Sequence, residues 1–123
     1  MRFPWPAAFL ADVILVVIFA WIGVEQHHGV LTLPTFAAAV WPFLAALAIG
    51  WIATLAWRAP AKPLRGGLPV WAVTVAGGMI LRALTGGGTA LPFVIVTAVT
   101  LLLFLVGWRV LAVLLRSARQ PRR

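Results

Sequence analysis

The fold is decided by residues 36–57, which read FAAAVWPFLAALAIGWIATLAW and contain no charged side chain. As a helix, a run of about 20 apolar residues crosses the hydrocarbon core of a bilayer. Similar apolar runs lie before and after it, at residues 6–24, 69–84 and 90–115. The sequence therefore predicts an all-α fold, an integral membrane four-helix bundle that forms a single domain over 1–123. The expected helices are about 6–25, 36–58, 69–84 and 89–115, with a basic tail at 116–123.

The composition supports a membrane protein. Hydrophobic residues make up 63% of the 123 residues and charged residues only 10%, whereas soluble domains carry about 25% charged residues. The net charge is +8, and the only acids are Asp12 and Glu25. The cations cluster in loops and in the tail, which is typical of cytoplasmic segments that face anionic lipid. We expect anionic lipid as a partner of the basic loop and tail, and no nucleic acid, because no recognition module is present.

The distribution of Lys and Arg predicts the orientation. With a cytoplasmic N-terminus, nine of the ten Lys and Arg residues lie on the cytoplasmic side and only Arg82 on the other. That asymmetry favours an N-in/C-in arrangement in the inner (plasma) membrane, with both termini cytoplasmic. Because the links between the runs are short, the helices should form two antiparallel hairpins.

Two patterns predict helix packing. Trp51 lies in the middle of the second run, where it fits neither membrane interface, so we expect it to pack between helices. Small residues also line the second and third runs, and small residues let helix backbones approach closely in lipid. We expect these positions to pack inside the bundle rather than between copies: Ala39, Ala46, Gly50 and Ala53 in the second run, and Thr74, Gly77 and Gly78 in the third.

Asp12 is the most deeply placed acid, about two turns into the first helix. A carboxylate inside the membrane is a candidate proton or cation site. The alternatives are a structural ion pair with Arg109, at the same end of the fourth helix, or a shallow position that lipid headgroups hydrate. The sequence leaves these interpretations open.

Arg82 ends the third run and precedes a glycine triplet. Its depth matches that of Glu25, so an ion pair could hold the first and third helices in register. Alternatively, Arg82 and the start of the fourth helix could form an anion site, since helix N-termini attract anions. A tight turn that needs positive φ would also account for the glycines. The residues of this turn or anion site are Gly86, Gly87, Gly88 and Thr89.

The chain carries no set of residues typical of an enzyme. Cysteine and tyrosine are absent, serine occurs once as Ser117, and the two acids should lie at opposite ends of one helix. His27 and His28 are adjacent, so their side chains cannot easily share one metal ion. We expect no catalytic activity, no metal site and no cofactor.

Two stretches resemble a known family. The first is Trp41-Pro42-Phe43-Leu44-Ala45 with Gly50-Trp51, and the second is residues 70–90 with the pattern Thr-Val-x-x-Gly-Met-x-x-Arg that ends at Arg82. Together with Asp12 and the turn at 23–28, they resemble the family known as domain of unknown function 3054, small prokaryotic multi-pass membrane proteins. The resemblance implies the four-helix membrane fold and carries no activity.

Two functional hypotheses follow. The first is a multi-pass inner-membrane protein that serves as an accessory or structural subunit, with a partner subunit or further copies of itself. The second is a small oligomeric ion or proton transporter or channel that uses Asp12 or Arg82.

Overall fold

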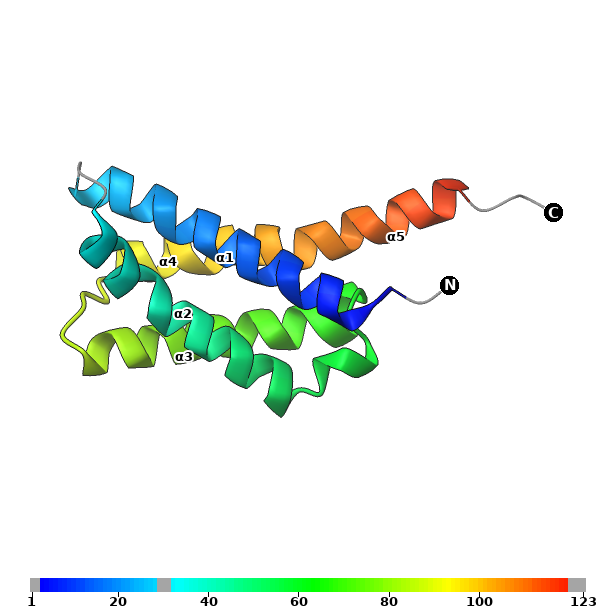
Figure 1. Ribbon diagram of the computed structural model, residues 1–123, viewed down its shortest axis with the longest axis horizontal. Helices are drawn as coiled ribbons and strands as arrows, with labels where there is room; N and C mark the ends of the chain where they lie inside the picture. The colour runs from blue at the N-terminus through cyan, green and yellow to red at the C-terminus, as the bar shows by residue number, and fades with distance from the viewer. Residues whose placement is uncertain (1–2, 29–31, 120–123) are drawn as a thin grey trace.

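The chain folds into antiparallel helices (Figure 1). A computed structural model describes residues 3–28 and 32–119, except for the side chains of residues 25–28 and 119. The helices are α1 (Trp5–His28), α2 (Leu33–Ala53), α3 (Leu68–Leu84), α4 (Leu91–Leu101) and α5 (Gly107–Arg119). A π-helical turn, η3 (Leu102–Val106), joins α4 to α5, so that α4, η3 and α5 form the fourth segment long and apolar enough to cross a membrane.

Helices α1, α2, α3 and α4 run in alternating directions, and α5 continues the direction of α4 (Figure 1). We call the end of the bundle where α1 begins and α2 ends the basic end. It also contains the short helices η1 (Ala56–Arg58) and η2 (Pro63–Gly67). We call the opposite end, where α3 ends and residues 85–90 turn into α4, the glycine end. Helix α5 projects beyond the other helices at the basic end.

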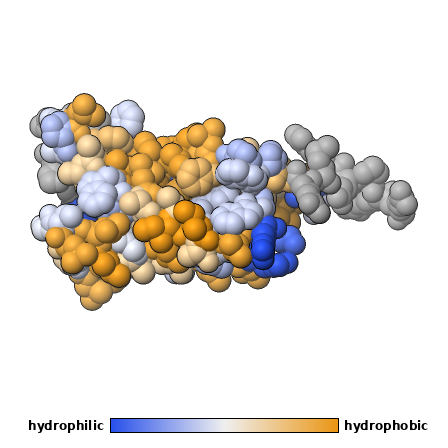
Figure 2. All heavy atoms as spheres, turned by 60° about the horizontal axis from the view of Figure 1, so that its bottom comes forward, coloured by the Kyte–Doolittle hydropathy of each residue, from blue (hydrophilic) through white to orange (hydrophobic). Residues whose placement is uncertain are grey.

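Four segments are long and apolar enough to cross a membrane. They are Trp5–Val24, Leu33–Ala53, Pro63–Leu84 and Leu91–Ala118. Hydrophobic side chains cover the body of the face shown in Figure 2, and strongly hydrophilic ones gather near the basic end. An apolar exterior of this kind suits lipid, because hydrocarbon offers nothing to hydrogen-bond with exposed polar groups. The all-α fold and the four membrane-length helices agree with the sequence prediction.

Helix α2 differs most from its expected bounds of 36–58. It begins at Leu33, because the Thr32 and Thr35 side chains form a capping box, with Thr35 N donating to Thr32 Oγ1 at 3.3 Å. It ends at Ala53, because Leu55 adopts the left-handed conformation with φ 53°, which disfavours continued helix in L-residues. Helix α2 therefore ends four residues before the apolar run ends at Trp57.

The other helices also differ from expectation at their ends. Helix α1 extends to His28 rather than 25, and the fourth segment begins at Leu91 rather than 89. That segment continues to Arg119, so part of the expected basic tail at 116–123 is helical. Hydropathy located the apolar cores of these helices, while local hydrogen bonding and turns set their ends.

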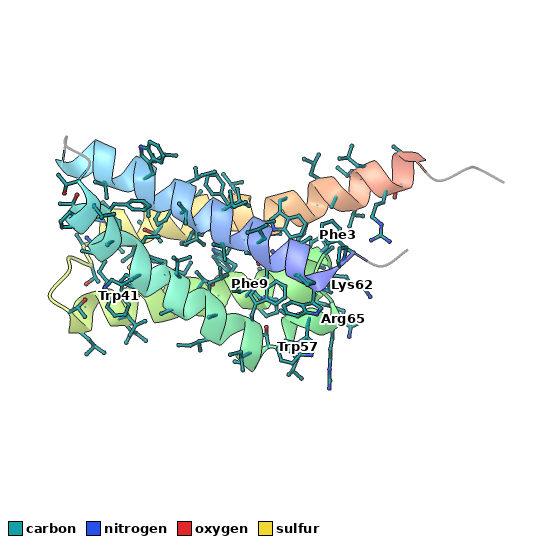
Figure 3. The ribbon with its side chains drawn as sticks, viewed as in Figure 1. Phe3, Phe9, Trp41, Trp57, Lys62 and Arg65 are labelled. Carbon is teal, nitrogen blue, oxygen red and sulfur yellow. The ribbon has the colours of Figure 1, made fainter. Side chains whose placement is uncertain are left out.

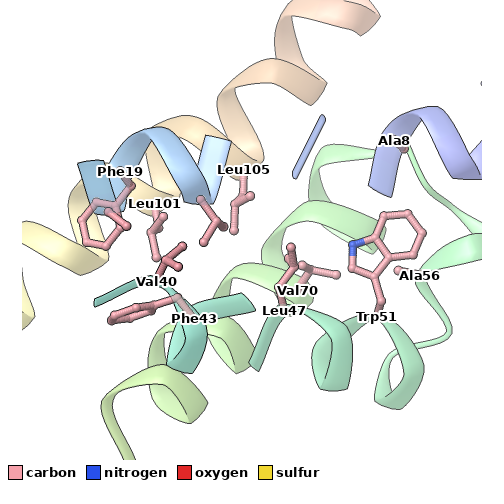
Figure 4. Close-up of a cluster of buried hydrophobic side chains, with 12 residues drawn as sticks. Ala8, Phe19, Val40, Phe43, Leu47, Trp51, Ala56, Val70, Leu101 and Leu105 are labelled. Carbon is pink, nitrogen blue, oxygen red and sulfur yellow. The ribbon is translucent and has the colours of Figure 1, made fainter. Parts of the chain in front are cut away.

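A cluster of apolar side chains fills the centre of the bundle (Figure 4). Phe19 of α1 meets Phe43 of α2 edge to face, with ring centroids 5.5 Å apart, a favourable geometry for aromatic pairs. Leu47 of α2 and Leu101 of α4 are completely buried. Buried side chains from different transmembrane segments thus share one core.

Small residues bring α2 and α3 together, as expected. A Cβ atom added at Gly77 would lie 3.0 Å from Cβ of Ala46, and one added at Gly78 would overlap the Phe43 ring. A Cβ atom added at Gly50 would lie 3.2 Å from Cβ of Val73. Ala53, by contrast, is exposed. The close approach therefore involves Ala46 and Gly50 of the predicted positions in α2, and Gly77 and Gly78 of those in α3.

We expect Gly78→Ala to destabilise the bundle by about 1–3 kcal/mol, because the buried Phe43 ring must move to make room. Gly23→Ala is the matched control, since a Cβ atom there meets nothing within 4 Å and alanine favours helix over glycine. Thermal unfolding in detergent should show a lower Tm for Gly78→Ala alone. Equal Tm values for the two variants would contradict the close packing of α2 on α3.

Candidate functional site

Asp12 lies on the inner face of α1. Ala8, Asp12 and Val16 are all completely buried, and their spacing of four residues places them on one side of a helix. Asp12 is about two turns from the start of the helix at Trp5. The side of α1 that faces the other helices therefore carries one carboxylate within an apolar stripe.

The π-helical turn η3 places Arg109 opposite Asp12. Thr97, Leu101, Leu105 and Arg109 are all completely buried at four-residue spacing. In a regular α-helix the first and last of them would point about 120° apart, because each residue adds about 100°. The wider turn of a π-helix reduces that rotation. The insertion of η3 thus keeps Arg109 on the buried face of the fourth segment.

The two side chains form a buried, bidentate ion pair. Arg109 Nη2 donates to Asp12 Oδ2 at 2.7 Å, and Arg109 Nη1 donates to Asp12 Oδ1 at 2.9 Å. Two indoles complete the set: Trp51 Nε1 donates to Oδ2 and Trp108 Nε1 donates to Oδ1, each at 2.8 Å. A carboxylate offers about four acceptor positions. Asp12 therefore accepts as many hydrogen bonds as it can hold.

Arg109 is also bound to backbone carbonyls. Its Nε donates to the Pro60 carbonyl at 2.8 Å, and its Nη1 donates to the Leu105 carbonyl at 2.6 Å. A Cβ atom added at Gly67 would lie 2.8 Å from Cδ of Arg109, so glycine at that position leaves room for the arginine side chain. We call Asp12, Arg109, Trp51 and Trp108 the ionic core.

Aromatic rings surround the ionic core. Phe9 packs edge to face on Trp51 with ring centroids 5.2 Å apart, and Phe3 lies 5.4 Å from Trp108. Cζ of Arg109 lies 4.7 Å from the Trp108 ring centroid, within the range of cation–π attraction. These rings enclose the charges in a water-poor environment, where electrostatic attraction is strong.

The structure brings together Asp12 and Arg109, the ion pair considered from the sequence. Trp51 packs between helices, as expected. The hydrogen bonds from Trp108 to Asp12 and from Arg109 to the Pro60 carbonyl were not predicted. The sequence carries no signal for them, because an indole N–H can also donate to a backbone carbonyl, as Trp71 Nε1 does to the Ala98 carbonyl at 2.8 Å.

The ionic core suits a structural role. Asp12 is completely buried, and each of its oxygens accepts two hydrogen bonds from side chains of the chain itself. A cation or proton bound there would have to displace one of these donors. The arrangement therefore joins α1, α2, the segment before η2 and α5 at one point.

Arg82 and the glycines occupy the other end of the bundle. Arg82 Nε donates to the Gly88 carbonyl at 2.6 Å, and its Cζ lies 4.6 Å from the Phe93 ring centroid. Gly86 has φ +84°, as a tight turn requires. A Cβ atom added at Gly87 would overlap the Arg82 side chain. The turn thus packs against the Arg82 side chain, and the Gly88 carbonyl accepts a hydrogen bond from its guanidinium group. The neighbouring Thr89 is exposed.

A cavity of about 300 Å³ adjoins Arg82. Most of its lining is apolar, and Arg82 is the one charged side chain among the described residues around it. The lining residues are Phe19, Ala20, Gly23, Val24, Ala39, Phe43, Arg82, Gly88, Ala90 and Phe93. The side chains of Glu25, His27 and His28 lie outside the described residues, so the ion pair between Arg82 and Glu25 stays a prediction.

We expect Asp12→Asn to destabilise the protein by about 3–5 kcal/mol, because it leaves the buried Arg109 without a counter-charge. Arg65→Gln, an exposed change at the same end of the bundle, should have little effect. The double variant Asp12→Asn/Arg109→Gln should be less destabilised than the sum of the single variants. Unfolding in detergent of the wild type, the three variants named here and Arg109→Gln alone checks this, and additive losses would show that the two residues are not coupled.

The comparisons with known proteins identify a family and no activity. Neither a curated protein nor a solved structure matches the chain. A family model described as "Protein of unknown function (DUF3054)" matches residues 9–112. The matched range contains all four residues of the ionic core as well as Arg82 and the glycine turn. The chain belongs to the DUF3054 family.

Proposed function

We propose that this chain is a structural or accessory subunit of the membrane, one that neither catalyses a reaction nor carries ions. The single observation that carries the proposal is the saturated Asp12 carboxylate. Its four hydrogen bonds, at 2.7–2.9 Å, hold three transmembrane segments in a fixed arrangement. Such a bundle offers a rigid apolar exterior to lipid or to a partner subunit.

The same observation argues against proton or cation transport through Asp12. Ionisable residues that carry ions across membranes face a water-filled cavity or a relay of similar groups. Asp12 is completely buried, and its partners are one arginine and two indoles. None of these partners is a carboxylate or a histidine, so among the described residues Asp12 has no relay of similar groups beside it.

The positions of the cations support an N-in/C-in orientation. Lys62 and Arg65 lie at the basic end (Figure 3), as do Arg58 of η1 and Arg116 near the end of α5. Arg82 lies at the glycine end. Since Lys and Arg accumulate on the cytoplasmic side of inner-membrane proteins, we place the basic end in the cytoplasm.

Single cysteines test this orientation, because the chain contains none of its own. Leu64 is 73% exposed at the basic end, and Thr89 is exposed at the glycine end. We expect a membrane-impermeant maleimide to label Thr89→Cys on intact cells and Leu64→Cys only after lysis. The reverse pattern would overturn the N-in/C-in orientation.

A second candidate function is anion transport through Arg82. The cavity beside Arg82 supports it, because a guanidinium group with apolar walls attracts anions more strongly than it would in water. The 2.6 Å hydrogen bond to the Gly88 carbonyl fixes the guanidinium group at that position. We rank this function second, because the turn presents a carbonyl oxygen rather than N–H donors to the site.

Flux measurements distinguish the two functions. The full chain is reconstituted in liposomes, and proton, chloride and fluoride fluxes are compared with those of empty vesicles. The structural role predicts no added flux. Anion transport through Arg82 predicts a flux that Arg82→Gln abolishes and the control Arg65→Gln leaves unchanged. A proton flux that Asp12→Asn removes from a folded protein would overturn the structural role of Asp12.

A further inference from the structure

We propose that the hollow at the basic end binds the phosphate headgroup of an anionic phospholipid. The hollow has a volume of about 840 Å³. It lies between the start of α1, the η1 segment with the residues that follow it, and α5. Its lining residues are Phe3, Pro4, Trp5, Trp57, Arg58, Ala59, Pro60, Ala61, Lys62, Val113 and Arg116.

The charge of the hollow favours an anion. Arg58, Lys62 and Arg116 line it, and no acidic residue does. The whole sequence has two acidic side chains, Asp12 and Glu25. Asp12 already accepts four hydrogen bonds in the ionic core. Glu25 lies 20 residues along α1 from Trp5, about 30 Å away along the helix axis. A carboxylate side chain of this chain therefore cannot neutralise Arg58 or Lys62 in the hollow.

The walls of the hollow favour a lipid over a soluble anion. Trp5 and Trp57 are 53% and 43% exposed, and Phe3 lies beside them in the lining. Indole rings favour the depth of the lipid headgroups, where one edge of the ring meets hydrocarbon and the other meets water. Val113 of α5 extends the apolar wall. The hollow thus combines cations for a phosphate with aromatic and aliphatic surface for glycerol and acyl chains.

The floor of the hollow is held in place by the ionic core. Pro60 belongs to the lining, and its carbonyl accepts a hydrogen bond of 2.8 Å from Arg109 Nε. Gly66 packs against the carbonyl of Ala59, so closely that a Cβ atom there would overlap it. The segment that carries Lys62 is therefore positioned before a lipid arrives, and preorganisation of this kind lowers the entropic loss on binding.

Lipid titration followed by native mass spectrometry tests the site on the full chain. We expect phosphatidylglycerol to bind more tightly than phosphatidylcholine of the same chain length. Arg58→Gln/Lys62→Gln should weaken phosphatidylglycerol binding by about five-fold for each cation removed, as expected for basic residues near anionic lipid. The charge-conserving variant Arg58→Lys/Lys62→Arg should retain most of the binding.

Arg65→Gln is the matched control. Arg65 is exposed and belongs to the same segment as Lys62, but it does not line the hollow. Equal weakening by Arg65→Gln and by Lys62→Gln would overturn the site and indicate attraction by overall charge. Equal binding of the two lipids would also overturn it. Displacement of the lipid by inorganic phosphate at the same concentration would show that a free anion, not a lipid, is the ligand. None of these outcomes depends on the flux measurements.

Discussion

The structure depends on one constraint: a carboxylate and a guanidinium group are both buried inside an apolar bundle, and neither can remain there alone. Removing an ion from water costs several kcal/mol even after relaxation, so a buried pair is stable only when its remaining hydrogen-bonding positions are also filled. The chain fills them with two indoles and two backbone carbonyls. These donors and acceptors come from α2, the segment before η2, η3 and α5. They connect the ion pair to the end of α2, to the chain reversal before η2 and to the π-helical turn.

The π-helical turn shows how that constraint shapes local structure. On a regular helix Thr97 and Arg109 would point about 120° apart, because a spacing of four residues gradually rotates away from a fixed direction. Widening one turn corrects the rotation just before the arginine. Gly67 also helps to position Arg109, because the absence of a Cβ atom leaves space for the aliphatic part of the arginine side chain. π-helical turns are often found at functional sites, and here the turn positions a structural ion pair.

Much of the fold could be predicted from the sequence, and the reasons for the failures are physical. Hydropathy alone predicts four membrane-length helices, since lipid requires about 20 apolar residues in each. Asp12 and Arg109 could be paired because they lie at similar depth in two of these helices. The end of α2 could not be predicted, because hydropathy does not distinguish Trp57 from Trp51. The helix ends between these two residues because Leu55 adopts a left-handed backbone conformation. The contributions of Trp108 and Pro60 could not be predicted either. They depend on the rotation that η3 introduces and on where the chain reverses, which are properties of the packed bundle.

The separation of Asp12 and Arg109 along the chain has a consequence for biogenesis. They are 97 residues apart, so the first helix leaves the ribosome long before its partner exists. At about 5–20 residues per second, Asp12 waits roughly 5–20 s for Arg109. During that time a carboxylate near hydrocarbon disfavours insertion of α1 by about 2.5–3.5 kcal/mol on insertion scales. The Leu, Ile, Val and Phe side chains of α1 each favour insertion by about 0.3–0.6 kcal/mol on the same scales, so their sum offsets this penalty. The unpaired carboxylate therefore weakens the insertion of α1 until Arg109 arrives, and completion of the ionic core removes that weakness.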